Sequence, residues 1–150
     1  MKILSAALLF VLATLSLPSF AEGALEVHQP WTRASAPGAP AAGFLKVINR
    51  TDSADILLDV SGRFAKRLEL HQSLMVDGMM KMIHQRDGVA IPAGGELILE
   101  PGSYHLMFMG LAQPFVVGET YSVQLTFQQA GVIEVILPVL SAEPGSDMAH

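Results

Sequence analysis

The chain has 150 residues, 9 Lys and Arg against 14 Asp and Glu, and a formal net charge of −5 at pH 7. This scattered acidic balance excludes the basic footprint of a nucleic-acid-binding protein. Cysteine is absent, which excludes cysteine-ligated zinc, thiol redox centres and blue-copper centres, because each of them needs a thiolate.

The first 21 residues predict a secretory signal peptide. Lys2 precedes an apolar run over residues 3–17, Pro18 interrupts that run, and the small residues Ser19 and Ala21 favour cleavage after Ala21. The run is short for a membrane span. We therefore expect an exported protein without stable membrane insertion, with one domain over residues 22–140 and a flexible tail over residues 141–150.

Short segments typical of strands follow one another along the rest of the chain. The predicted strands cover residues 43–49, 56–60, 68–76, 79–84, 96–100, 104–109, 121–127 and 132–139, with a loop over residues 34–42. Asp77-Gly78 predicts a two-residue hairpin turn between residues 76 and 79. Many strands, frequent Gly and Pro, and no helical periodicity predict an all-β fold, an antiparallel Greek-key sandwich.

Methionine and histidine gather in one part of the sequence. Six of the eight methionines lie between Met75 and Met109, and His71, His84 and His105 lie in or beside that window. Methionine most often fills gaps in a core. Strand alternation separates that interpretation from a metal site, because successive side chains point to opposite faces.

In the predicted hairpin, alternation gives one apolar face and one face of potential ligands. The apolar face, which we expect to be the core, carries Leu70, Leu74, Val76, Met79 and Ile83. The other face carries His71, Ser73, Met75, Met80, Met82 and His84. His71 and Met82 then lie diagonally across the pair, about 7–8 Å apart at Cα, within reach of a shared ion.

The strand over residues 104–109 repeats this arrangement. Tyr104, Leu106 and Phe108 are expected to face the core, whereas His105, Met107 and Met109 share the opposite face. The predicted metal ligands are therefore His71, Met82, His105 and Met107. Thioether sulfur is a poor ligand for zinc, calcium or magnesium but suits Cu(I). Since the imidazoles must be neutral to bind, affinity should fall below about pH 6.5.

This pattern resembles the PCuAC family of periplasmic copper chaperones. The family signature is a histidine, ten residues, a methionine, twenty-one residues and then His-x-Met. His71 and Met82 match the first spacing, and His105 and Met107 supply the His-x-Met, with one residue more before them than in the signature. The flanks also match, at Pro30-Trp31-Thr32-Arg33, Ala41-Ala42-Gly43-Phe44, residues 91–95 and Pro101-Gly102.

The resemblance implies a cupredoxin-like sandwich that binds one Cu(I) in the periplasm. It also implies delivery of copper to the copper-bearing subunit of cytochrome c oxidase during assembly, alongside a Sco-type copper protein. Copper storage or resistance, and a metal-free exported interaction sandwich, remain as alternatives. An enzyme is not expected, because the mature chain would begin at Glu22 without a terminal histidine, and no Ser-His-Asp pattern stands out.

Several further residues near the predicted site have no single assignment. Met75, Met80, His84 and Met109 are interpreted as supporting residues, alternative ligands or the rim of a docking surface. Trp31 is expected to be a packing residue. Met148 and His150 in the tail are not expected to form a defined metal site.

Overall fold

The computed structural model describes residues 24–145, and this part of the chain folds into ten strands without a helix. The strands are β1 (Leu25–Arg33), β2 (Ala41–Asn49), β3 (Asp55–Ser61), β4 (Ala65–Val76), β5 (Met79–His84), β6 (Val89–Ile91), β7 (Glu96–Leu99), β8 (Tyr104–Leu111), β9 (Thr120–Phe127) and β10 (Gly131–Leu140). The predicted signal peptide, Met148 and His150 lie outside the described residues. Within them, no helix is long and apolar enough to span a membrane.

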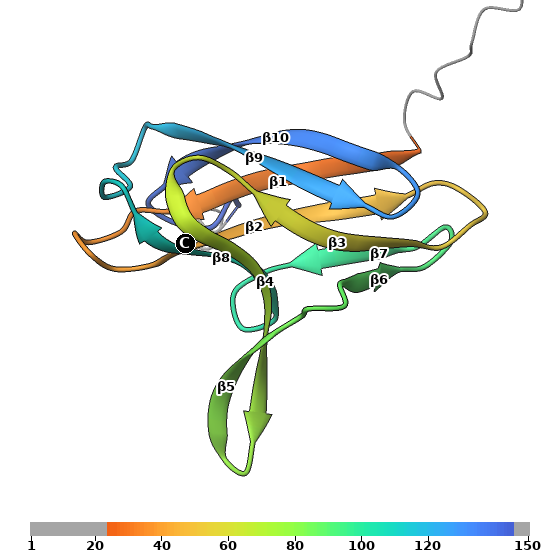
Figure 1. The fold of residues 1–150 in the computed structure, drawn as a ribbon, viewed down its shortest axis with the longest axis horizontal. Helices are drawn as coiled ribbons and strands as arrows, with labels where there is room; N and C mark the ends of the chain where they lie inside the picture. The colour runs from red at the N-terminus through yellow and green to blue at the C-terminus, as the bar shows by residue number, and fades with distance from the viewer. Residues whose placement is uncertain (1–23, 146–150) are drawn as a thin grey trace, which may run out of the picture.

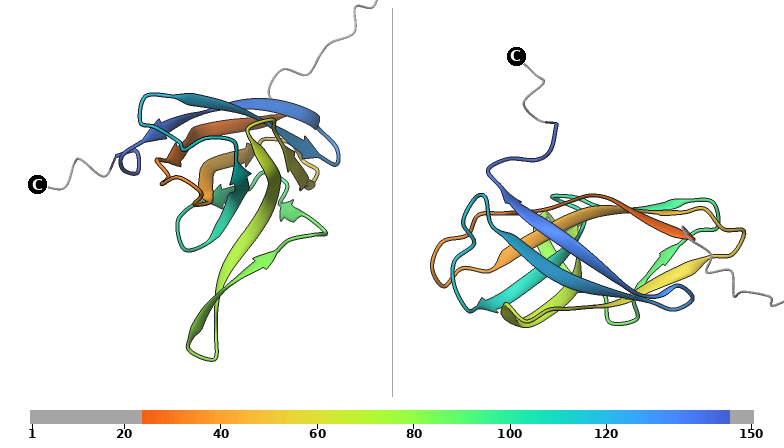
Figure 2. Two further views of the ribbon diagram at one scale, coloured as in Figure 1. Left: turned by 60° about the vertical axis from the view of Figure 1, so that its left-hand side comes forward. Right: turned by 90° about the horizontal axis from the view of Figure 1, so that it is seen from above.

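The strands form one hydrogen-bonded ribbon that folds back on itself into two layers (Figures 1 and 2). The strand order is β5-β4-β8-β7-β2-β1-β10-β9-β3-β6, with β8 also paired to β2. β10 connects the layers, because it pairs with β1 in parallel and with β9 in antiparallel orientation. Apart from β1–β10 and β7–β8, the pairings are antiparallel. The predicted all-β sandwich is confirmed.

The core lies between the layers and includes the inner face of β8. Leu106 and Phe108 of β8 are fully buried, as are Leu57 of β3 and Leu125 of β9. Burial of such side chains stabilises the sandwich by about 1.5–3 kcal/mol each. The inner face of β8 was predicted correctly. Its outer face carries His105, Met107 and Met109.

Two strands, β1 and β6, were not predicted from the sequence. β1 (Leu25–Arg33) does not alternate evenly, because a bulge shifts its register against β2 between His28 and Trp31. Gln29 within this bulge has a φ of 48°, and Pro30 follows it. β6 has only three residues, and Pro92 follows directly after it. Neither strand gives the period-two pattern on which the prediction depends.

The β4–β5 hairpin has the predicted turn and register. Asp77 and Gly78 have φ values of 52° and 77°, as a primed hairpin turn requires. His71 pairs with His84, Ser73 with Met82, and Val76 with Met79.

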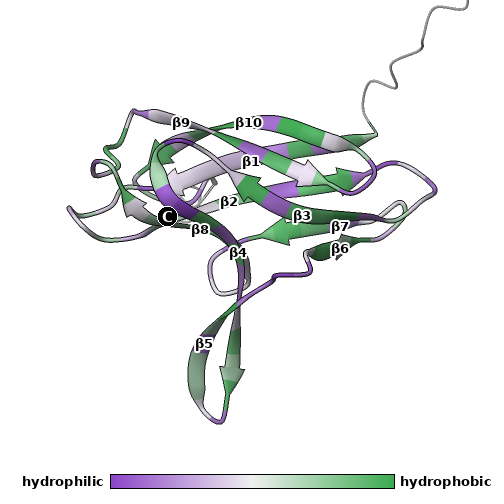
Figure 3. Ribbon diagram, viewed as in Figure 1, coloured by the Kyte–Doolittle hydropathy of each residue, from purple (hydrophilic) through white to green (hydrophobic). Residues whose placement is uncertain are grey.

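The predicted core face of this hairpin is wrong beyond Leu70. The hairpin projects from the sandwich (Figure 1) and carries hydrophobic residues into the projection (Figure 3). Leu74, Met79 and Ile83 are exposed, whereas Leu70 is buried. The reason is that β8 pairs with β4 only as far as Gln72, so the rest of the hairpin has no neighbour but itself among the described strands.

A small ion-pair cluster joins β1 to the end of β2 and should make stability depend on pH. Glu26 accepts a hydrogen bond from Arg50 at 2.7 Å and lies 2.8 Å from His28 Nε2. The hydrogen bond from Arg50, followed by that from His28, lowers the pKa of Glu26 from 4.5 to about 2. Because the unfolded chain binds the proton more readily, the contribution of Glu26 is complete above its unfolded pKa and is lost as pH falls through about 2.

We therefore expect Glu26→Gln to lower the unfolding midpoint slightly at neutral pH, with a difference that fades as pH approaches 2. The effect should be small and salt-sensitive, because these side chains are exposed. Thermal unfolding of both chains along a pH series measures it. A midpoint difference that stays constant over the pH series would contradict the contribution of ionised Glu26 to stability.

Candidate metal centre

Three histidines form a row across three neighbouring strands. His71 on β4 lies opposite His84 of β5 on one side and opposite His105 of β8 on the other. The ring centroids of His71 and His84 are 5.5 Å apart, and those of His71 and His105 are 5.8 Å apart. Since β8 leaves β4 after Gln72, the row lies at the base of the projecting hairpin.

His105 presents one nitrogen with an unused lone pair. Its side chain is buried, at 3% exposure. Nδ1 donates a hydrogen bond to the Ser103 carbonyl oxygen at 3.0 Å, and Nε2 is buried without a hydrogen-bond partner within residues 24–145. Burial lowers the pKa of His105, which outweighs the opposite effect of the hydrogen bond to Ser103. The imidazole is therefore neutral at neutral pH, with its lone pair on Nε2.

Glu69 holds the ring of His71 in place. Nε2 of that ring donates a hydrogen bond to Glu69 Oε2 at 2.8 Å, and its Nδ1 is buried without a hydrogen-bond partner in the part of the chain that the structure describes. The same hydrogen bond is the main reason that the pKa of Glu69 is lowered, so the carboxylate stays ionised. A carboxylate that accepts from one ring nitrogen fixes the tautomer and orients the other nitrogen toward a metal. His71 and His105 thus each have one buried ring nitrogen that accepts no hydrogen bond from the described residues.

The predicted thioether ligands flank this row on opposite sides. Met107 pairs with Glu69, and Met82 pairs with Ser73. Both methionines are therefore diagonal to His71, at a Cα separation of about 7–8 Å. Met107 is half-buried on β8, whereas Met82 is 56% exposed on the hairpin. His71, His105 and Met107 come together in the sheet, while Met82 lies on the projecting hairpin.

The other methionines of the window differ in their surroundings. Met109 lies 3.2 Å from Arg67 Nη2 through its sulfur, so a cation already occupies that side of the thioether. Met75 and Met80 pair near the tip of the hairpin and are exposed.

Glu69 is the functional candidate that the sequence analysis did not identify. It lies two residues before His71, on the same face of β4, and its side chain contacts both His71 and His84. The signal was present in the alternation of the strand, which places residues 69 and 71 on one side.

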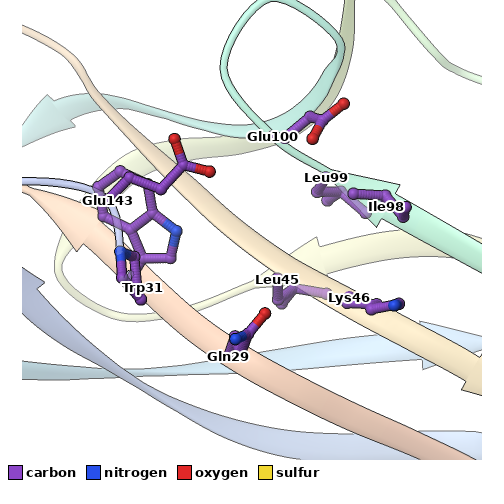
Figure 4. Close-up of a pocket in the computed structure, with 9 residues that line it drawn as sticks. Gln29, Trp31, Leu45, Lys46, Ile98, Leu99, Glu100 and Glu143 are labelled. Carbon is purple, nitrogen blue, oxygen red and sulfur yellow. The ribbon is translucent and has the colours of Figure 1, made fainter. Parts of the chain in front are cut away.

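A separate hollow beside β1, β2 and β7 is not part of this candidate site. It has a volume of about 180 Å³ and includes Trp31, Lys46 and Ile98 in its lining (Figure 4). Its lining among residues 24–145 contains neither histidine nor methionine. Trp31 is buried against Phe44, with ring centroids 4.8 Å apart. The prediction that Trp31 is a packing residue is confirmed.

Comparison with known proteins places the chain in a family. The family model described as "Putative lipoprotein LpqE-like" matches residues 25–139. The chain belongs to the LpqE-like family. "Putative lipoprotein Lxx21020" of Leifsonia xyli subsp. xyli is 32% identical over 127 residues, which cover 85% of this chain and 76% of that protein.

Solved structures with the same fold include PCuAC domains. The apo PCuAC domain from PmoF1 has a TM-score of 0.67 at 22% identity and covers 80% of this chain and 96% of its own. The copper-bound PCuAC domain from PmoF2 has a TM-score of 0.65 at 21% identity, covering 80% and 95%. The CuI form of DR1885 from Deinococcus radiodurans has a TM-score of 0.57 at 27% identity, covering 80% and 82%. The resemblance to PCuAC proteins is confirmed.

Proposed function

We propose that this chain binds one Cu(I) ion through His71, His105, Met107 and Met82 and carries it outside the cytoplasm. The observation that carries the proposal is the pair of facing imidazoles, each with one buried nitrogen that has no hydrogen-bond partner among the described residues. An unpartnered buried polar atom costs about 1–3 kcal/mol. A metal ion between the two rings would remove this cost at both nitrogens.

The ligand types favour Cu(I) over other ions. Two neutral imidazoles and two thioethers form a soft donor set, which suits Cu(I) and not zinc, calcium or magnesium. The Glu69 carboxylate, hydrogen-bonded to His71, adds a negative charge next to the ion without entering the ligand set. The names of two solved structures of this fold, the copper-bound PCuAC domain from PmoF2 and the CuI form of DR1885, support the same ion.

The difference in exposure among the ligands suits a carrier. His105 is buried and Met107 is half-buried, whereas Met82 lies on the projecting hairpin. We infer that Met82 is the outermost ligand and the first to be displaced by an acceptor. Copper could then leave by ligand exchange, without unfolding of the sandwich.

The proposed role is delivery of copper in the periplasm to the copper-bearing subunit of cytochrome c oxidase, together with a Sco-type copper protein. The names of the family and of the Leifsonia relative, both putative lipoproteins, support a place outside the cytoplasm. Storage or resistance would use the same copper site. A transfer assay separates these purposes, because a carrier should pass Cu(I) to the apo oxidase subunit, whereas a storage protein should keep it.

The site itself is tested by anaerobic Cu(I) titration against a competing chelator. We expect the wild-type chain to bind one tight equivalent and Met107→Leu to weaken it at least about tenfold. Met109→Leu is the matched control, since Met109 lies on the same face of β8 but contacts Arg67. Equal Cu(I) affinity in the wild type and Met107→Leu would contradict this ligand, and no Cu(I) binding at all would favour a metal-free interaction sandwich.

A further inference from the structure

A second group of potential metal ligands lies on the other side of the His71 ring. Glu69 Oε2 is 2.8 Å from His71 Nε2 and 3.5 Å from His84 Nδ1. With one ligand atom taken from each residue, all three atoms lie within 4.8 Å of one another. Tetrahedral donors around one zinc ion lie about 3.3 Å apart, as zinc–nitrogen distances of about 2.0 Å require. Small side-chain rotations would therefore bring the three atoms around one ion.

The strands hold these three residues in place independently of the thioethers. Glu69 and His71 follow each other on one face of β4, and His84 lies opposite His71 on β5. The side chains of Glu69 and His71 are 19% and 12% exposed, whereas that of His84 is 35% exposed. The group is therefore supported from within the sheet and open on the hairpin side, where an ion and a water ligand can enter.

We infer that Glu69, His71 and His84 form a second metal site, which takes a divalent transition-metal cation. One carboxylate and two imidazoles supply nitrogen and oxygen donors, which suit zinc and Cu(II). A water molecule completes four ligands. This site goes beyond the proposed Cu(I) function and does not depend on it.

His71 makes the two sites mutually exclusive. A neutral imidazole has one lone pair and one N–H. When Nδ1 binds Cu(I), Nε2 keeps its proton and donates it to Glu69; when Nε2 binds a divalent ion, the proton lies on Nδ1. The chain therefore holds a soft ion or a harder ion at His71, but not both. This competition rests on the proposed function, whereas the divalent site itself does not.

Titration of the metal-free full-length chain with Zn(II), followed by calorimetry, tests the site. We expect Glu69→Gln and His84→Ala each to weaken one Zn(II) equivalent at least about tenfold. Met80→Leu should leave it unchanged, and it is a matched control because Met80 shares the strand and face of His84. His150 is present in all variants, so any contribution from the tail is common to them. Equal Zn(II) affinity in the wild type and His84→Ala would overturn the site.

Cu(I) titration of the same variants distinguishes this inference from the proposed function. His84→Ala should keep the Cu(I) affinity of the wild type, and wild-type chain preloaded with Cu(I) should lose the Zn(II) equivalent. If His84→Ala keeps the wild-type Zn(II) affinity while Met107→Leu still weakens Cu(I) binding, the second site is contradicted and the proposed function is supported. If Zn(II) binding needs Glu69 and His84 while Cu(I) does not bind, only the proposed function falls. Unfolding midpoints of the metal-free variants check that each chain is folded.

Discussion

Replacing His105 by leucine is expected to abolish tight Cu(I) binding while leaving the metal-free fold as stable as before, or more stable. The Cu(I) affinity should fall at least about a hundredfold, since removing even a hydrogen-bonding partner of a metal ligand costs tenfold to about a hundredfold. His105 is buried, and its Nε2 has no hydrogen-bond partner among the residues that the structure describes. Its replacement by an apolar side chain removes that atom and should raise the free energy of unfolding by about 1 kcal/mol.

The hydrogen bond that His105 loses in this variant leaves no buried group unpaired. The Ser103 carbonyl, which accepts from His105 Nδ1, also accepts from the Ser73 backbone N–H at 3.0 Å. This second bond remains in His105→Leu. The opposite signs of the two effects would identify His105 as a residue retained for binding and not for stability.

Urea unfolding with and without Cu(I) measures both effects in one experiment. Cu(I) should raise the midpoint of the wild type, because it binds the folded state, and should not change that of His105→Leu. His28→Leu serves as control, since His28 lies on β1 beside Glu26 and outside the histidine row. A His105→Leu chain that still gains stability from Cu(I) would move the binding site to the hairpin or the tail.

The arrangement of the candidate ligands was predictable as far as strand alternation and one turn determine it. Asp77-Gly78 fixed the register of the hairpin, and that register places His71 opposite His84 and diagonal to Met82. The apolar residues Leu106 and Phe108 fixed the inner face of β8, which left His105 and Met107 on the other face. These are local rules, because they depend on neighbours in sequence or across a two-residue turn.

The parts that could not be predicted depend on contacts between distant segments. Alternation alone made Leu74 and Ile83 look like core residues, but no second layer of the described strands covers them. The facing of His71 and His105 requires β4 to pair with β8 in one particular register, which no short-range pattern specifies. The same pairing sets Glu69 opposite Met107.

The second large effect concerns stability, and it arises where Gly43 of β2 packs against Phe108 of β8. A Cβ atom at Gly43 would lie 2.7 Å from Phe108 Cζ and 3.0 Å from Phe108 Cε2. Phe108 cannot easily move, because it is fully buried and meets Phe64 edge-to-face with ring centroids 5.0 Å apart. Gly43→Ala should therefore lower the free energy of unfolding by about 1–3 kcal/mol through overpacking. Phe108→Ala should lower it by about 3–5 kcal/mol through loss of a buried ring.

The double variant is expected to be more stable than the sum of the single effects allows. Once the ring of Phe108 is gone, the new methyl group of Gly43→Ala enters the space that it leaves, so most of the overpacking cost disappears. Urea unfolding of the four chains gives this coupling, which should be at least about 0.5 kcal/mol. Phe127→Ala is the control partner, because Phe127 is equally buried but is not among the nearest atoms to Gly43. Strict additivity of Gly43→Ala with Phe108→Ala would mean that something other than this ring requires glycine at position 43.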